Sequence, residues 1–422
     1  MTRRCAASQG SDASRVQCGT PPISTHLSMT PFESSIESLK QLITFDSVSS
    51  RSNRAISDWV SERLETLGFT IEQTSYLDHA GIEKTNVLAK REPIKTSNNH
   101  ALRSEWQASD PKGVAYFCHT DVVPTRGWNG PGDDPFSPKL VDNRIYGRGS
   151  CDMKGSLAAM MAAAAEVDHI DQRQPLWIVC TADEEVGFIG AKQLVAESPG
   201  YQEIVSQQPL GLIGEPTNLN VVHAHKGIIG FKITSIGKAA HSSTKHGINA
   251  NRQMVPLLQK LLEINERTES ESNYHDDRFD PPTLSWNFGC NDGCTAINIT
   301  PDLSTAWLSL RPMPEIDGSD LISEVYSCAS ELGLKVEQCG QGPPMWISPD
   351  SKGIRELSEL TGSTSRTVCY GTDGGELHAL KERVVYGPGD IAQAHTTDEW
   401  IALEQLRMGS QSFCEILRRW CC

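Results

Sequence analysis

Long apolar runs are missing from this chain of 422 residues. The longest, residues 157–165, is rich in alanine and too short to cross a bilayer, which takes roughly 18–20 residues. Basic charge is also scarce, because 38 lysines and arginines stand against 53 aspartates and glutamates, a formal net charge of −15. No dense run of lysine or arginine offers the positive footprint of a nucleic-acid-binding surface. We therefore expect neither a membrane protein nor a nucleic-acid-binding protein.

The apolar core of a secretory leader is not visible in the first residues either. We therefore expect a cytoplasmic protein whose 13 cysteines are reduced thiols rather than a disulfide framework. Residues 1–28 are rich in Ser, Thr and Gly and show no periodicity, which predicts a disordered extension and raises Met29 as an alternative start.

What is present alternates short apolar strands with amphipathic helices. In residues 29–226 and 338–422 this pattern predicts an α/β domain with a mainly parallel sheet covered on both faces. Residues 227–337 read instead as strand, helix, strand, strand, helix, which predicts a separate α+β domain inserted into the first. Residues 91–112 are polar and unpatterned and predict a loop insertion. Short apolar segments predict strands at residues 114–118, 177–180, 211–213, 228–236, 283–288, 303–310 and 384–386.

Acidic side chains and a histidine follow three of these strands. His119 and Asp121 follow the first, Glu184 and Glu185 the second, and Glu215 the third. The carboxyl ends of parallel strands meet at one sheet edge, where ligands bind in open α/β sheets. Each segment alone also fits a plainer structure, such as a buried histidine bonded to an aspartate or a solvated acidic turn.

Two glycine-rich segments add further candidates. Asp152 lies in the run from Gly147 to Gly155, whose spacing fits neither a dinucleotide loop nor a phosphate-binding loop, and which alone fits a helix N-cap equally well. His395 follows Gly387-Pro-Gly389. Two histidines and three carboxylates suit two zinc ions that share a bridging carboxylate. Glu184 is then left over as a general base for metal-assisted hydrolysis.

Six segments occur in a fixed order: residues 119–124, 147–155, 181–187, 213–217, 225–227 and 387–399. In this order they resemble the co-catalytic zinc family of deacylases and peptidases, and within it the acetylornithine deacetylases. Succinyl-diaminopimelate desuccinylase and carboxypeptidase G-type enzymes belong to the same family. The resemblance runs from about Met29 to the C-terminus.

The resemblance implies a ligand set for two Zn²⁺ ions, for which Co²⁺ or Mn²⁺ could substitute. Asp152 would bridge the two ions, His119 and Glu215 would complete one site, and Glu185 and His395 would complete the other. A cis peptide bond after Asp152 is also implied.

The resemblance further implies that Glu184 is the catalytic base and that Asp121 supports His119. His241, in the segment Gly237–Ser243, resembles the lid-domain histidine that stabilises the oxyanion, in dimers from the other subunit. Asn298 and Arg311 match positions that bind the substrate carboxylate. A homodimer formed through the inserted domain is therefore expected.

One departure from the family bears on the substrate. Acetylornithine deacetylases tend to carry Thr-Glu-Ala where this chain reads Gly371-Thr-Asp-Gly-Gly-Glu376. Asp373 and Glu376 either face a substrate ammonium group or are plain loop carboxylates.

The expected reaction is hydrolysis of N²-acetyl-L-ornithine to L-ornithine and acetate, a step of arginine biosynthesis. Within the family the alternatives are desuccinylation of diaminopimelate, deacetylation of citrulline and dipeptide hydrolysis. A non-catalytic relative that binds amino acids is a further alternative, although all five ligand positions and the base are present. A serine hydrolase is disfavoured because the chain has no G-x-S-x-G elbow.

Overall fold

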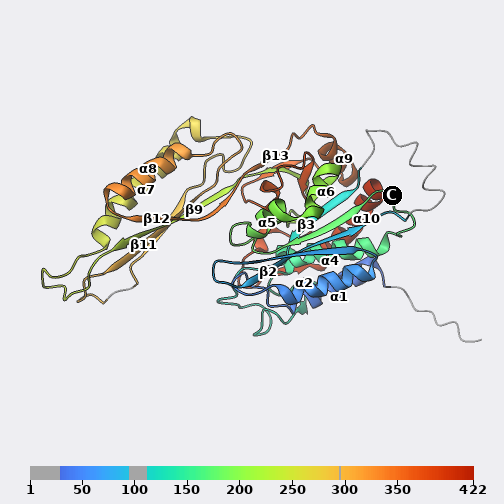
Figure 1. Ribbon diagram of the computed structural model, residues 1–422, viewed down its shortest axis with the longest axis horizontal. Coiled ribbons are helices and arrows are strands. Elements are labelled where there is room, and N and C mark those ends of the chain that lie inside the picture. The colour runs from blue at the N-terminus through green and yellow to red at the C-terminus, as the bar shows by residue number, and fades with distance from the viewer. Residues whose placement is uncertain (1–28, 95–111, 294–295) are drawn as a thin grey trace, which may run out of the picture.

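The computed structural model describes residues 29–94, 112–293 and 296–422. The predicted extension at residues 1–28 and most of the predicted insertion at residues 91–112 lie outside these ranges. Figure 1 shows a larger body built from both ends of the chain and a smaller body formed by its middle. Among the described residues, no helix combines the length and the apolar character needed to cross a bilayer.

The larger body is built on a nine-stranded sheet in the order β1-β2-β6-β3-β7-β15-β8-β13, with β14 paired to β8. Its strands are β1 (Thr70–Leu77), β2 (Glu83–Arg91), β3 (Val114–His119), β6 (Leu176–Thr181), β7 (Leu210–Ile213), β8 (Val222–His225), β13 (Met345–Trp346), β14 (Arg366–Val368) and β15 (Arg383–Val385). The four central strands, β6, β3, β7 and β15, are parallel, whereas β1, β2 and β13 pair antiparallel at the two sides. The predicted parallel sheet is therefore confirmed for the centre that carries the site.

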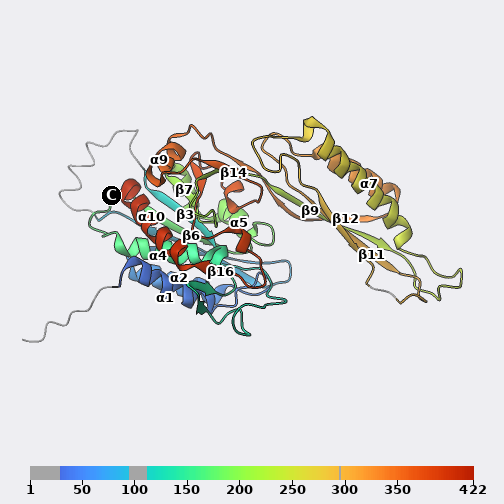
Figure 2. The ribbon, with the colours of Figure 1, turned by 180° about the vertical axis from the view of Figure 1, so that it is seen from behind.

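Helices cover both faces of this sheet (Figures 1 and 2). They are α1 (Pro31–Ile43), α2 (Arg54–Thr66), α4 (Gly155–Glu166), α5 (Ile189–Glu197), α6 (Pro199–Gln207), α9 (Lys352–Thr361) and α10 (Leu403–Cys421), with short turns η1 (Ser150–Lys154), η3 (Asp373–Gly375) and η4 (Ile391–Gln393). Tyr116 and Cys118 of β3 pack in the cluster formed with α1, α2, α4 and α10, and Ala115 and Phe117 pack in the cluster formed with α5 and α6. A strand buried on both faces loses the polar alternation of a half-exposed strand, which explains its continuous apolar run.

A small sheet joins two distant parts of the larger body. Its strands are β4 (Lys139–Val141), β5 (Arg144–Tyr146) and β16 (Trp400–Ala402), in the order β16-β5-β4. Trp400 is the register partner of Tyr146, so the segment that carries His395 lies beside the glycine-rich run that carries Asp152.

The smaller body is the predicted inserted domain. Its four strands are antiparallel in the order β10-β11-β9-β12, and two long helices pack on the sheet. The elements are β9 (Ile228–Ile236), α7 (Asn251–Ser270), η2 (Ser272–Tyr274), β10 (Asn287–Asn291), β11 (Leu303–Leu310), α8 (Ser319–Glu331) and β12 (Lys335–Gly342). Ile228 pairs with Gly342, so the domain leaves and rejoins the larger body through two adjacent strands.

Two expectations for this domain need correction. The predicted boundary at residue 337 falls inside β12, which the sequence pattern misses because this edge strand is polar and mostly exposed. The predicted strand at residues 283–288 begins only at Asn287. The preceding chain turns instead around Lys226, whose Nζ donates hydrogen bonds to the carbonyl oxygens of Pro281 and Thr283.

Candidate active site

The carboxyl edge of the central strands carries most of the predicted site residues. His119 is the last residue of β3, and Glu184 and Glu185 lie in the turn after β6. Glu215 lies just beyond β7, and His395 lies in the loop after β15. Parallel pairing brings these strand ends together at one edge, as the sequence predicts.

Asp152 reaches the same edge from the turn before α4. Gly149 starts this turn with φ +80°, a conformation that glycine adopts without strain. The peptide bond between Asp152 and Met153 is cis, as the family resemblance implies. The turn sets the Asp152 carboxylate beside the end of β3 rather than along the helix.

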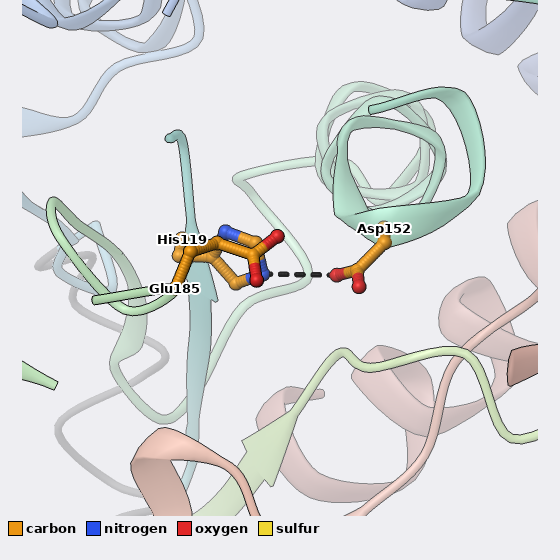
Figure 3. A group of neighbouring side chains, drawn as sticks. All are labelled: His119, Asp152 and Glu185. Atoms are coloured by element: carbon orange, nitrogen blue, oxygen red, sulfur yellow. Dashed lines mark hydrogen bonds and ion pairs between the residues drawn. The ribbon is translucent and has the colours of Figure 1, made fainter. Parts of the chain in front are cut away.

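Asp152 stands between two histidine–glutamate pairs. Its Oδ1 lies 3.0 Å from Nε2 of His119, and that nitrogen lies 3.7 Å from Oε1 of Glu215. Its Oδ2 lies 3.3 Å from Nε2 of His395, which lies 2.9 Å from Oε2 of Glu185. Figure 3 shows His119 and Asp152 facing one another, from the end of a strand and from the turn before a helix.

The carboxyl groups of this cluster lie out of water and close to one another. Burial raises the pKa of Glu185 to about 7 and raises the pKa values of Glu184 and Glu215 well above their usual range, and neighbouring carboxylates add to these increases. Burial alone would also raise the pKa of Asp152, but hydrogen bonds with His119 and His395 outweigh it and lower that pKa.

The pKa values of the two imidazoles are also raised, because the carboxylates around them stabilise their charged form. Hydrogen bonds with Asp152 and Glu185 raise the pKa of His395 to about 10. Burial would lower the pKa of His119, but its hydrogen bond with Asp152 and the nearby carboxylates raise it. Acidic groups outnumber the imidazoles, so further positive charge would stabilise the cluster.

The donor set fits divalent metal ions. Ligand atoms of His119, Asp152 and Glu185 all lie within 4.8 Å of one another. Imidazole nitrogen and carboxylate oxygen are donors that zinc and related ions accept. The described residues therefore form a candidate metal centre.

Asp121 contacts His119, as expected, and also contacts the turn that carries the two glutamates. Nδ1 of His119 lies 2.9 Å from the backbone oxygen of Asp121 and 3.7 Å from its carboxylate. The carboxylate accepts hydrogen bonds from the Ser49 hydroxyl, at 2.7 Å, and from the backbone N–H groups of Glu184 and Glu185, at 3.1 and 3.4 Å. Its side chain thus fixes the turn that carries the two glutamates, while its backbone orients His119.

A buried ion pair that sequence reasoning missed supports the same turn. Nζ of Lys84 lies 2.7 Å from Oδ1 of Asp183, and the Tyr76 hydroxyl donates to the other carboxylate oxygen. Lys84 and Asp183 are each 1% exposed. No spacing pattern joins residues that lie 99 positions apart.

A cleft of about 470 Å³ opens onto the cluster, lined by both bodies. The larger body contributes Asp152, Glu184 and His395, and the inserted domain contributes Ile228 and Arg311. Arg311 is the only arginine or lysine among the described residues that line the cleft. It can meet an anionic group on a molecule bound beside the cluster.

Six predicted site residues are not among the described residues that line this cleft, and two of them, His119 and Asp121, are buried beside it. His241 and Asn298 are exposed, in the segments that follow β9 and precede β11. Figure 1 shows these connecting segments at the end of the inserted domain away from the larger body. A backbone hydrogen bond of 3.0 Å from Ser242 to Asn298 holds these two loops together.

Tyr370 and Gly371 line the cleft, whereas Asp373 and Glu376, which follow them in the chain, are not among its lining residues. Asp373 is 4% exposed and accepts a hydrogen bond of 2.6 Å from the Thr181 hydroxyl. Glu376 lies 3.7 Å from Nζ of Lys192. Neither carboxylate is among the described residues that line the cleft, so contact of Asp373 or Glu376 with a substrate ammonium group stays a prediction.

The chain was compared with known proteins. Residues 115–419 match the family model for Peptidase family M20/M25/M40. The chain is 31% identical over 380 residues to an acetylornithine deacetylase from Myxococcus xanthus, covering 87% of this chain and 92% of that protein.

Solved structures share the fold at lower identity. Human carnosine dipeptidase 1 is 16% identical, with a TM-score of 0.69 over 92% of this chain and 97% of that chain. The Bacillus subtilis YXEP protein, described as a dinuclear metal-binding peptidase of the M20 family, is 13% identical, with a TM-score of 0.57 over 92% and 98%.

Proposed function

The chain belongs to Peptidase family M20/M25/M40, and from this premise we propose that it hydrolyses N²-acetyl-L-ornithine to L-ornithine and acetate. The observation that carries the proposal is the arrangement of two histidine–glutamate pairs around Asp152 beside a cleft that also holds Arg311. The proposal places the enzyme in the cytoplasm and in arginine biosynthesis.

Two zinc ions are the proposed cofactors, with cobalt or manganese as substitutes. His119 and Glu215 would hold one ion, Glu185 and His395 the other, and Asp152 would bind both. Bound divalent ions supply Lewis-acid polarisation of the acyl carbonyl and acidify water. The excess of buried carboxylates in the cluster supports this assignment.

Glu184 is the proposed general base. Its carboxyl group lines the cleft, and burial raises its pKa, which favours proton uptake near neutral pH. It takes a proton from water as the water oxygen attacks the acetyl carbon. It then gives that proton to the departing amine as the carbon–nitrogen bond breaks, which yields acetate and ornithine.

Arg311 is proposed to bind the α-carboxylate of the substrate, since its guanidinium group offers a bidentate match to a carboxylate. Partial burial lowers the pKa of Arg311. Asp373 and Glu376 are proposed to favour a substrate ammonium group through their negative charge.

The inserted domain is proposed to form a homodimer and to bring His241 and Asn298 to the cleft of the partner subunit. Neither residue lines the cleft of its own chain among the described residues, and both are exposed. The exposed apolar side chains Val255 and Leu262 on α7 and Trp307 on β11 support a protein partner for this domain.

Substrate choice is tested by amine release from N²-acetyl-L-ornithine after zinc reconstitution. N-succinyl-L,L-diaminopimelate, N²-acetyl-L-citrulline and a dipeptide run alongside, each with and without chelator. We expect chelator-sensitive turnover that is fastest on acetylornithine. Faster turnover of another substrate would assign a different hydrolase activity of the same family, which the Gly371–Glu376 departure favours as the second candidate.

A subunit-mixing experiment tests the role of His241. His241→Ala and Glu184→Gln should each be nearly inactive alone. After mixing and subunit exchange, half of the dimers are mixed and one of their two sites is intact, so about a quarter of wild-type activity should return. His246→Ala, a variant at a neighbouring histidine that should be fully active, provides the matched control. When it is mixed with His241→Ala, subunit exchange should not change the total activity of the mixture. Failure of the first mixture to regain activity, despite proven exchange, would place His241 outside the partner's site.

A further inference from the structure

Glu399 makes an unusual set of contacts beside the metal centre. Its Oε1 accepts hydrogen bonds from the backbone N–H groups of Cys151 and Asp152, at 2.9 and 3.0 Å. Its Oε2 accepts from the N–H of Gly149 and from Nη1 of Arg148, both at 2.8 Å. A carboxylate has about four acceptor positions, so this side chain is fully used. It is 1% exposed and does not line the cleft.

The small sheet sets Glu399 at this place. Glu399 directly precedes β16, whose pairing with β5 continues through a hydrogen bond of 3.0 Å from the N–H of Gly147 to the Glu399 carbonyl. The glycine-rich turn therefore wraps around the Glu399 side chain. Its three N–H groups converge on one carboxylate, which fixes the backbone from which Asp152 projects.

Arg148 extends this contact to the other side of the centre. While Nη1 binds Glu399, Nη2 donates a hydrogen bond of 2.9 Å to the carbonyl oxygen of Thr396, the neighbour of His395. The Arg148–Glu399 pair thus joins the backbone that carries Asp152 to the backbone that carries His395. The two side chains it joins lie 3.3 Å apart, between Oδ2 and Nε2.

We propose that Glu399 is a positioning residue for the metal centre, which acts with Arg148 to fix the separation of Asp152 and His395. The inference rests on the proposed function, because it assigns Glu399 to the metal site of that reaction. Glu399 itself neither ligates the metal nor touches substrate. Partners that orient metal ligands typically affect metal affinity or activity by 10–100-fold.

Glu399→Gln tests the proposal because the amide keeps the side-chain length but can accept hydrogen bonds through one atom only. One pair of donors then loses its acceptor. We expect Co²⁺ affinity, measured by titration, to fall by about 10–100-fold. We also expect the visible absorption of the Co²⁺-saturated protein to change, because the ligands are displaced. A variant that is only less stable would keep the wild-type spectrum and affinity in its folded fraction.

Glu382→Gln is the matched control. Glu382 also accepts a backbone N–H, that of Gly353 at 3.1 Å, but lies just before β15, at the opposite end of that strand from the site. Its cobalt affinity and spectrum should match wild type. Wild-type affinity and spectrum in Glu399→Gln would overturn the proposal.

Arg148→Lys keeps the test decisive if Glu399→Gln fails to fold. Lysine retains the charge and leaves the three backbone hydrogen bonds in place, but its single nitrogen cannot reproduce the forked contact with Glu399 and Thr396. Cobalt affinity should fall by a smaller factor than in Glu399→Gln, and an unchanged affinity would overturn the proposal. These measurements use the metal alone, so a failed deacetylase assay and a failed positioning role give separate results.

Discussion

Glu184→Gln is expected to lower kcat for acetylornithine hydrolysis by about 10²–10⁴-fold, the usual contribution of general acid–base catalysis. Glutamine is nearly the same size but cannot take a proton from water. Glu184 lines the cleft, whereas the close cluster of ligand atoms is formed by His119, Asp152 and Glu185. The variant should therefore keep its bound metal, and the measurement is amine release together with metal content per chain.

Glu197→Gln is the control for this prediction, since Glu197 is an exposed residue of α5. It should have wild-type kcat and metal content. Near-normal turnover in metal-loaded Glu184→Gln would remove Glu184 from the reaction and would leave the metal-site assignment intact. Loss of metal in Glu184→Gln would instead make Glu184 a ligand, contrary to its proposed role.

Asp152→Ala is expected to lose both metal ions and to reduce turnover by at least about 10³-fold, because metal ions contribute several kcal/mol and each decade corresponds to about 1.4 kcal/mol. One carboxylate oxygen of Asp152 lies 3.0 Å from Nε2 of His119, and the other lies 3.3 Å from Nε2 of His395. Without it, His119 and His395 have no shared carboxylate. Metal analysis after dialysis and amine release with added zinc measure the two effects.

Asp133→Asn provides the comparison, because Asp133 is exposed in the loop before β4. It should retain both ions and full activity. His119→Ala is a useful second variant, because it should weaken one of the two sites and leave Glu185 and His395 in place. Two tightly bound ions in Asp152→Ala would contradict a shared carboxylate.

Most of the gathered residues could be predicted because they end a strand or follow one within a few residues. His119 ends β3, and Glu184, Glu185 and Glu215 lie within a few residues of β6 and β7. An apolar strand followed by a polar side chain is visible in sequence, and parallel pairing then brings the strand ends together. Asp152 could be predicted as a site residue only from several motifs taken together, since its own segment fits a helix N-cap equally well.

Contacts between distant segments could not be predicted in this way. The carboxylate of Asp121 binds the backbone of Glu184 and Glu185 as well as lying 3.7 Å from Nδ1 of His119, and only the contact with His119 is between near neighbours in the sequence. The partners of Glu399 and of Lys84 lie far away in sequence and leave no periodic signal. The sequence pattern does not predict β12, because this strand lies at the edge of its sheet and is polar and mostly exposed.

The register partnership of Ile228 and Gly342 also means that the smaller body can be removed as one unit. Paired residues on neighbouring antiparallel strands lie about 5 Å apart, a gap that a tight turn can close. Excision of the intervening chain would thus leave a continuous polypeptide with the carboxyl edge of its sheet intact. It would also remove Arg311, the only arginine or lysine among the described residues that line the cleft. The shortened chain would therefore keep the residues of the metal cluster but lose the side chain that we propose binds the substrate carboxylate.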